Sequence, residues 1–417
     1  MRWRDPSAPA STAAHETTTR HAGAIYPLLH DVGRGVPGVL IGTDLLGGLF
    51  AYDPFELYRA GVLTNPNAIV FGQIGRGKSA LIKTYLLRQL AFGRQAFVLD
   101  PKGEYGALAA SIGHTSLALK PGGALRLNPL DLAGGDDARA RQLQLLEALL
   151  GSSAGRAIGP RERATLEVAL DRAGREAPPT IPGVVEALLD PDGVAAAVLR
   201  TSVAELVADG RDIGLELRRL VHGDLAGMFD GPTTEDLAIE GALVVLDLSA
   251  LYGSPALGIL MACASAWLQS AVRRSAASGR QVLLVVDEAW AILRDVAVSR
   301  WLQTAWKLSR AWGVANMAVL HRVSDLEAVG GAGSEQRRLA EGLLLDSETR
   351  IVYAQPAGEI EAAAKLLMLT DVEQEVVGRL GRGVALWKVA NHSSLVHHLI
   401  SSAEREIIDT DGAMGRR

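Results

Sequence analysis

Residues 70–87, VFGQIGRGKSALIKTYLL, place a glycine-rich turn between an apolar strand and an apolar helix. The segment matches the pattern G-x-x-x-x-G-K-[ST] through Gly72, Gly77, Lys78 and Ser79. Glycines let consecutive backbone N–H groups approach a phosphate without a Cβ in the way, and a helix that begins at the lysine directs its positive dipole end to the same anion. The alternative is an accidental glycine turn. Because the motif follows a strand and precedes a helix, as this mechanism requires, it predicts a nucleotide-binding P-loop.

The loop and the start of its helix supply the expected nucleotide contacts. Lys78 is predicted to neutralise the β- and γ-phosphates, and the Ser79 hydroxyl to ligate Mg²⁺. The complete nucleotide-binding set that the motif predicts is Gly72, Gln73, Ile74, Gly75, Arg76, Gly77, Lys78, Ser79 and Ala80.

A second motif, VLLVVDEAW, ends a continuous apolar strand with two adjacent acids. Asp287 is predicted to hold Mg²⁺ through its water shell, and Glu288 to polarise the attacking water. Two acids stabilised by the dipole of an ordinary helix N-terminus are the alternative, but the upstream P-loop favours catalysis. The adjacent acids, and a sequence without the guanine-reading pattern N-K-x-D, favour ATP over GTP. We therefore expect ATP and Mg²⁺ at this site.

Short apolar strands alternate with helical patterns, which predicts an α/β fold with a mostly parallel sheet and helices on both faces. Between residues 131 and 240 the apolar spacing is helical throughout, which predicts an all-helical insertion. The strands are expected at 67–72, 95–100, 241–248, 281–287, 314–320 and 349–354, with an antiparallel hairpin of 383–390 and 394–400. The expected divisions are a disordered lead-in (1–25), a first part of the ATPase core with the P-loop (26–130), the insertion (131–240), a second part of the core (241–408) and a tail (409–417).

Composition limits the compartment and the partners. The net charge of −5 gives no whole-chain basic signature of nucleic-acid binding, and the single cysteine excludes an intramolecular disulfide. The longest apolar run, 257–268, is shorter than the roughly 18–20 residues that cross a bilayer. The first residues lack the apolar centre of a signal peptide. We expect a cytoplasmic protein without its own membrane segment, which reaches the inner face of a membrane through partners.

Several segments occur in an order typical of one family. They are GQIGRGKSALIK, FVLDPKGEYGALA, LRLNPLDL, LLVVDEAWAIL and SRAWGVANMAVLHRVSDL. Over roughly residues 38–410 the chain resembles the motor domain of the fourth VirB component of type IV secretion and conjugation systems, within the HerA–FtsK superfamily. The resemblance implies a RecA-like P-loop ATPase core, assembly into a hexamer, and secretion-channel proteins as partners.

The resemblance also implies two more site residues. Arg310 occupies the place from which an arginine reaches the γ-phosphate of the neighbouring subunit, and a solvated arginine at a helix end is the alternative. His321 stands where the superfamily usually has a phosphate-sensing glutamine. A histidine donates or accepts a hydrogen bond as glutamine does, but it can also gain a proton near neutral pH. A purely structural histidine at a strand end is the alternative.

Asp100 and Glu104, in FVLDPKGEY, are expected next to the P-loop strand. Asp100 is predicted to support the P-loop or the water shell of the metal, and Glu104 to cap the following helix. For both acids a structural role is favoured over a catalytic one.

The predicted function is that of an ATP-hydrolysing motor, hexameric when active, which powers conjugative DNA transfer or type IV-like secretion. Its catalytic residues would be Glu288, Lys78, Arg310 and His321. One alternative is a HerA- or FtsK-like translocase that acts on double-stranded DNA in repair or segregation. The other is an ATP-dependent assembly scaffold with little turnover.

Overall fold

The computed structural model describes residues 38–131, 137–175, 178–223, 225–234, 240–254, 256–293, 310–321 and 335–408, and positions 299, 303, 306 and 307. The predicted lead-in and tail lie outside these residues. The strands are β1 (Val39–Asp44), β2 (Leu49–Tyr52), β3 (Ala68–Phe71), β4 (Gln95–Asp100), β5 (Leu117–Ala118), β6 (Leu243–Asp247), β7 (Val282–Val286), β8 (Val314–Leu320), β9 (Thr349–Val352), β10 (Val384–Val389) and β11 (His392–His398). The α-helices are α2 (Pro54–Arg59), α3 (Lys78–Ala91), α4 (Gly106–Ser111), α5 (Ala138–Ala154), α6 (Pro160–Ala173), α7 (Ile181–Leu189), α8 (Gly193–Leu199), α9 (Val203–His222), α10 (Leu257–Ala277), α11 (Trp290–Leu293), α14 (Glu335–Leu345), α15 (Ile360–Leu367), α16 (Asp371–Val377) and α17 (Ser402–Ile408). Short 3₁₀ turns are η1 (Ser249–Leu251), η2 (Arg310–Trp312) and η3 (Ala357–Glu359).

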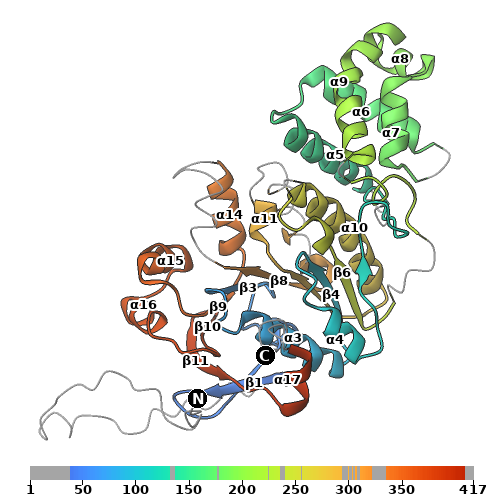
Figure 1. Ribbon diagram of the computed structural model, residues 1–417. Helices are drawn as coiled ribbons and strands as arrows, with labels where there is room; N and C mark the ends of the chain where they lie inside the picture. The colour runs from blue at the N-terminus through green and yellow to red at the C-terminus, as the bar shows by residue number, and fades with distance from the viewer. Residues whose placement is uncertain are drawn as a thin grey trace, which may run out of the picture.

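One sheet of 11 strands runs through the molecule in the order β2-β1-β11-β10-β9-β3-β8-β7-β4-β6-β5 (Figure 1). The strands from β9 to β5 pair in parallel, and the four strands from β2 to β10 are antiparallel. The predicted α/β class with a mostly parallel sheet is confirmed. Each predicted strand is present, with both ends within two residues of the expected positions.

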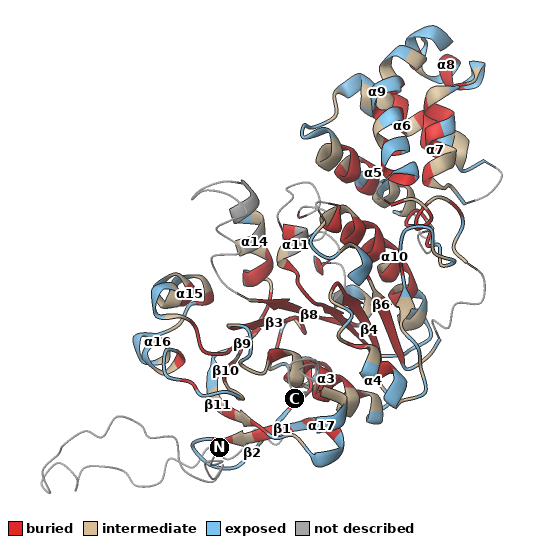
Figure 2. Cartoon of the chain, in the orientation of Figure 1, coloured by how far each residue is buried: buried red, intermediate tan, exposed pale blue. Residues whose placement is uncertain are grey.

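The central strands are buried on both faces, which explains why their sequences are continuously apolar (Figure 2). Along β3, Ile69 and Phe71 belong to one hydrophobic core, whereas Ala68 and Val70 belong to the other. The helices α3 and α4 pack on the second core, and α10 packs on the first. The sheet therefore separates two cores, and α3, which starts at the P-loop, is fixed on one of them.

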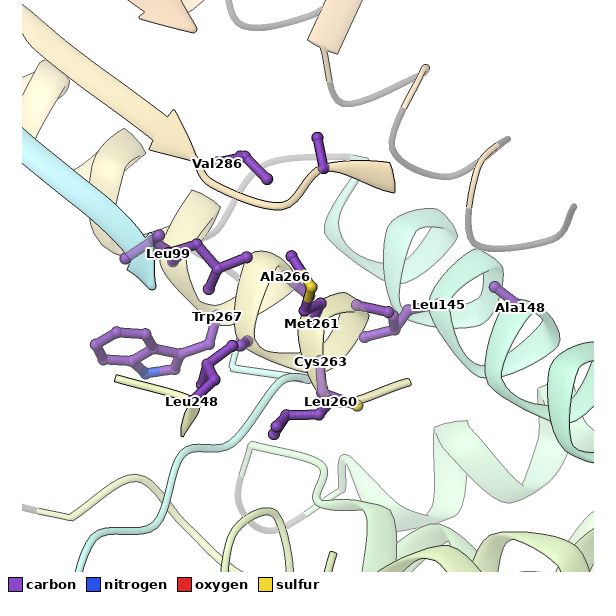
Figure 3. Close-up of a cluster of buried hydrophobic side chains, with 14 of the residues drawn as sticks. Leu99, Leu145, Ala148, Leu248, Leu260, Met261, Cys263, Ala266, Trp267 and Val286 are labelled. Atoms are coloured by element: carbon purple, nitrogen blue, oxygen red, sulfur yellow. The ribbon is translucent and has the colours of Figure 1, made fainter. Parts of the chain in front are cut away.

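The helix α10 occupies the centre of the larger core. Its residues Met261, Cys263 and Trp267 are fully buried, and Figure 3 shows them between the sheet and α5. Burial raises the pKa of the Cys263 thiol well above its ordinary value, so this cysteine is an inert packing residue. Leu145 of α5 belongs to the same core, so α5, the first of the helices α5 to α9, packs on the sheet layer through α10.

The described residues between 137 and 234 form helices α5 to α9 and no strand. Local sequence explains where these helices begin. Ser202 and Glu205 form a capping box at α9, Thr180 caps α7, and Pro160 is the first residue of α6. The helical character agrees with the sequence pattern, and the domain boundaries at 131 and 240 stay a prediction.

Two features differ from the sequence expectation or were absent from it. The prediction that Asp100 lies beside the P-loop strand is wrong, because β8 and β7 lie between β3 and β4.

The hairpin β1–β2 was not predicted, because its strands are short and depend on β11, which lies far away in the sequence. A Cβ at Gly42 would lie 1.9 Å from the backbone oxygen of His397, so close pairing of β1 with β11 requires glycine there.

Among the described residues, no helix has the length and apolar character that spanning a membrane requires.

Candidate nucleotide site

The P-loop connects β3 to α3 and its shape depends on glycine. Gly75 and Gly77 adopt φ values of 80° and 111°, which side-chain-bearing residues rarely adopt. At Gly72 a Cβ would lie 2.4 Å from the Cβ of Tyr353, the residue that follows β9. Gly75 and Gly77 are thus required by their backbone conformation, whereas Gly72, with a φ of 156°, is required both by its conformation and by the close approach of Tyr353.

The start of α3 is built to receive an anion. Gly77 is the N-cap, and it provides no side-chain capping bond, while the first turn contains no acid. The first N–H groups of a helix have no intrahelical partner, so they point toward whatever occupies the loop. Ser79 and Ala80 lie half-buried in this first turn, next to the loop.

Segments from the far end of the chain support the outside of the loop. The N–H of Gly383 donates to the Arg76 oxygen at 3.0 Å, and the Tyr353 hydroxyl donates to the Gly77 oxygen at 3.4 Å. The N–H of Gln73 donates to the oxygen of Ala354 at 3.3 Å. These bonds hold the loop in place from β9 and β10. Of the remaining predicted contact residues, the Ile74 side chain is 67% exposed and points to solvent.

The Lys78 side chain is buried against the P-loop. Its Nζ donates to the backbone oxygen of Gly72 and to that of Gln73, the latter at 3.1 Å. The ammonium group therefore lies inside the loop, and its phosphate-neutralising role stays a prediction.

Asp287 directly follows β7 and is buried. Its carboxylate accepts a hydrogen bond from the Tyr105 hydroxyl at 3.2 Å and one from the N–H of Glu288 at 2.9 Å. Burial raises its pKa to about 6, and the charges of Glu288, Glu104 and Asp100 add to the effect. Asp287 thus lies in a group of acids, and the charges of Asp287, Asp100 and Glu104 also act on the buried ammonium of Lys83.

Glu288 is also buried, and three side chains contact its carboxylate. Lys102 and His321 both contact Oε1, and the Nε1–H of Trp290 donates to Oε2. Burial alone would raise the pKa of Glu288, but the hydrogen bonds and charges of His321 and Lys102 outweigh it and lower the pKa to about 2. Glu288 is therefore held as a carboxylate. Its φ of 51° is a left-handed conformation, which is uncommon for a residue with a side chain.

The two residues implied by the family resemblance have different outcomes. His321 directly follows β8, and β8 lies between the P-loop strand and the strand of the two acids. Its Nε2 contacts Glu288, and its Nδ1 is buried without a hydrogen-bond partner among the described residues. Arg310 opens η2 immediately before β8, and its side chain lies outside the described residues. The sensing role of His321 and the trans role of Arg310 stay predictions.

Lys102 was not predicted as a site residue. It lies in the turn after β4, where Asp100 accepts the N–H groups of Lys102, Glu104 and Tyr105 at 3.2, 3.1 and 2.9 Å. Asp100 therefore shapes this turn. The prediction that Glu104 caps the next helix is wrong, because Tyr105 is the N-cap of α4 and no side-chain bond caps it. A lysine between two strand-end acids in the sequence, DPKGE, was the signal available for Lys102.

The residues present fit Mg²⁺ together with a nucleotide. The Ser79 hydroxyl and the Asp287 carboxylate are oxygen donors, which Mg²⁺ prefers. The described residues contain no group of three or more His, Cys, Asp or Glu arranged to hold a metal. A magnesium ion here would need oxygens from the phosphates of a nucleotide and from water, which is its usual mode in phosphoryl-transfer sites.

Comparison with known proteins supports the fold. No protein-family model and no curated protein matches the chain. Among solved structures, VirB4 of Thermoanaerobacter pseudethanolicus matches with a TM-score of 0.73 and 22% identity, covering 90% of this chain and 99% of that one. The bacterial conjugative coupling protein TrwBdeltaN70 matches with a TM-score of 0.57 and 14% identity, covering 87% and 90%. The plasmid coupling protein TrwB in complex with ADP and Mg²⁺ matches with a TM-score of 0.56 and 15% identity, covering 81% and 86%. The chain thus has the RecA-like P-loop ATPase fold of VirB4 and TrwB, which confirms the predicted resemblance at the level of the fold.

Proposed function

We propose that this chain is an ATP-hydrolysing motor that works as a hexamer and powers conjugative DNA transfer or type IV-like secretion. The observation that supports this most is the buried, ionised Glu288 at the end of β7, at the same edge of the sheet as the P-loop. In P-loop ATPases an acid in this place orients the attacking water. The fold shared with VirB4 and with a conjugative coupling protein supports the biological setting.

Each site residue has a role in this proposal. The P-loop N–H groups and Lys78 bind the phosphates, for which Lys78 turns from the backbone oxygens of its own loop toward the substrate. Ser79 directly and Asp287 through water would hold Mg²⁺, which would supply charge neutralisation. Glu288 accepts a hydrogen bond from the attacking water and orients it toward the γ-phosphate. Binding the substrate in one orientation and stabilising its charge provide most of the catalysis in phosphoryl transfer.

The hexamer gives Arg310 its proposed role. An arginine that arrives from the neighbouring subunit would stabilise the charge of the transition state, so hydrolysis would depend on ring assembly. The proposed partners are further copies of the chain, secretion-channel proteins that bring it to the inner face of the membrane and, in the case of conjugative transfer, DNA.

ATP turnover per chain, measured against protein concentration with and without double-stranded DNA, tests the proposal. We expect turnover to rise with concentration as rings assemble, and Lys78→Ala to abolish it. The matched control is Lys388→Met. Lys388 lies on β10, in the antiparallel part of the sheet, and pairs with Glu373 of α16. Wild-type turnover no higher than that of Lys78→Ala would contradict the motor function and favour a scaffold. Stimulation by DNA together with movement along it would favour the translocase alternative.

A further inference from the structure

The ends of three adjacent parallel strands meet at Glu288. Glu288 follows β7, which lies between β8 and β4 in the sheet. His321 follows β8, and Lys102 lies in the turn after β4. The carboxylate of Glu288 is therefore flanked by one side chain from each neighbouring strand, and both contact the same oxygen, Oε1.

Lys102 is held in this position from its other side as well. Its Nζ lies 5.7 Å from the ring centroid of Tyr252, which follows η1, and 3.3 Å from Nε2 of His321. Its side chain is only 23% exposed, and that of Glu288 is 1% exposed. Such a pair differs from a surface salt bridge, because removing Lys102 leaves the buried charge of Glu288 without its ion-pair partner.

The backbone at Glu288 indicates that the position of this carboxylate matters. A left-handed φ of 51° costs free energy for a residue that has a Cβ, and such conformations persist where the surroundings impose them. Oε2 is fixed by Trp290 and Oε1 by Lys102 and His321. Among the three contacts, Lys102 alone brings a permanent positive charge.

We propose that Lys102 is a positioning residue for ATP hydrolysis, which holds the Glu288 carboxylate in the one orientation that can direct the attacking water. The inference rests on the proposed function and adds a residue to its site. Without the ammonium group, hydrogen bonds from His321 and Trp290 remain, but the carboxylate loses its ion pair and can rotate. A rotated carboxylate would lower the rate of the chemical step while leaving the binding of ATP at the P-loop intact.

Steady-state ATP hydrolysis by Lys102→Met, Lys102→Arg and the control Lys388→Met tests this role. We expect Lys102→Met to lower kcat by about tenfold or more with KM for ATP changed less than about twofold. Lys102→Arg restores a cation and should recover kcat to within about threefold of the wild type. Lys388→Met breaks an ion pair with Glu373 whose side chains are each 12% exposed, at the end of β10 opposite to Gly383, and should leave both constants unchanged.

Three kinetic results would overturn the proposal. The first is a wild-type kcat in Lys102→Met. The second is an increase of KM alone in that variant, which would mean that Lys102 contacts the nucleotide itself. The third is a kcat of Lys102→Arg no higher than that of Lys102→Met. A wild-type protein without turnover would overturn the proposed function, and the positioning role of Lys102 with it.

Thermal unfolding tests the contact between Lys102 and Glu288 independently of ATP turnover. We expect the destabilisation by Lys102→Met to be smaller in a Glu288→Gln background than in the wild type, because the buried charge is then absent. Strictly additive shifts would show that Lys102 and Glu288 do not interact, whatever the activity.

Discussion

The candidate site has two parts that differ in which atoms form them. One is the P-loop, and the other is the Glu288 cluster, defined as Glu288 with Lys102, Trp290 and His321. The P-loop is a run of consecutive residues, 72–80, whose backbone forms the binding surface. The Glu288 cluster joins residues up to 219 positions apart, Lys102 and His321, and its parts are side chains. One half depends on which backbone conformations are allowed, and the other on buried charge.

This difference determines how each half tolerates substitution. In the P-loop, an added methyl group is harmful where it overlaps a neighbouring residue or requires an unfavourable φ. In the Glu288 cluster, shape-conserving changes that remove one charge are harmful, because the remaining charges stay buried. Substitutions that keep the shape and change the charge, or the reverse, therefore distinguish the two halves.

Glu288→Gln should have the largest effect of all. It keeps the shape of the side chain and removes the charge, so ATP hydrolysis should fall by about 100- to 10,000-fold. ATP binding at the P-loop should be retained, so the variant should accumulate bound ATP rather than ADP. Turnover assays and chromatography of the nucleotide retained by the protein measure both quantities. Wild-type turnover in this variant would place the catalytic acid elsewhere and would show that the Glu288 cluster is not part of the catalytic site.

Gly72→Ala should destabilise the fold more than Gly75→Ala. The new methyl group at residue 72 meets the Cβ of Tyr353, an overpacking that costs about 2–3 kcal/mol. At residue 75 the Cβ meets nothing within 4 Å, so only the left-handed backbone conformation costs about 1 kcal/mol. Urea denaturation gives both free energies of unfolding. Equal losses would mean that steric contact with β9 does not set the shape of the loop.

The sequence predicted the elements of the fold better than their arrangement. The strands were predictable because buried parallel strands are continuously apolar, as 95–100 and 314–320 are. The position of β4, which two strands separate from β3, was not predictable from local sequence, because strand order depends on where each connecting helix returns to the sheet. The hairpin β1–β2 was missed because its pairing partner, β11, lies at the other end of the chain.

The candidate site divides in the same way. All predicted P-loop residues are contiguous, so their relative positions follow from one motif. Lys102 reaches Glu288 only because β4 and β7 are neighbours, a fact that no local pattern contains. The contact between His321 and Glu288 was anticipated only as proximity, through the family resemblance. Once the strand order is known, polar residues at the ends of adjacent parallel strands are the natural candidates for contact.

His321→Gln and His321→Ala test the contact between His321 and Glu288. Glutamine can still donate a hydrogen bond to Glu288, so we expect ATP turnover within about threefold of the wild type. Alanine removes the donor, and turnover should fall by about tenfold or more. Steady-state assays on both variants, with Lys388→Met as control, measure the effect. Equal activity in the two variants would remove His321 from the mechanism and leave Lys102 and Trp290 as the residues that orient Glu288.

The smallest effect should come from the far end of the P-loop helix. Arg88 of α3 donates to both carboxylate oxygens of Glu404 in α17, at 2.7 and 2.8 Å. Burial opposes ionisation of Glu404, but the bonds from Arg88 and Ser401 outweigh it and lower the pKa to about 2. Because the folded pKa lies below the unfolded value of about 4.3, the ion pair stabilises the fold above that pH and loses its effect as the pH falls toward 2.

Glu404→Gln should therefore lower the free energy of unfolding by about 1–2 kcal/mol at neutral pH. The deficit relative to the wild type should shrink steadily below about pH 4.3, because the wild-type carboxylate is then protonated more readily in the unfolded chain than in the folded one. Denaturation at several pH values measures it, with Glu406→Gln, an exposed acid on the same helix, as control. A deficit that does not change with pH would mean that Glu404 stabilises α3 by packing. In that case the support of the P-loop helix by α17 would depend on shape, as the loop itself does, and not on buried charge as the Glu288 cluster does.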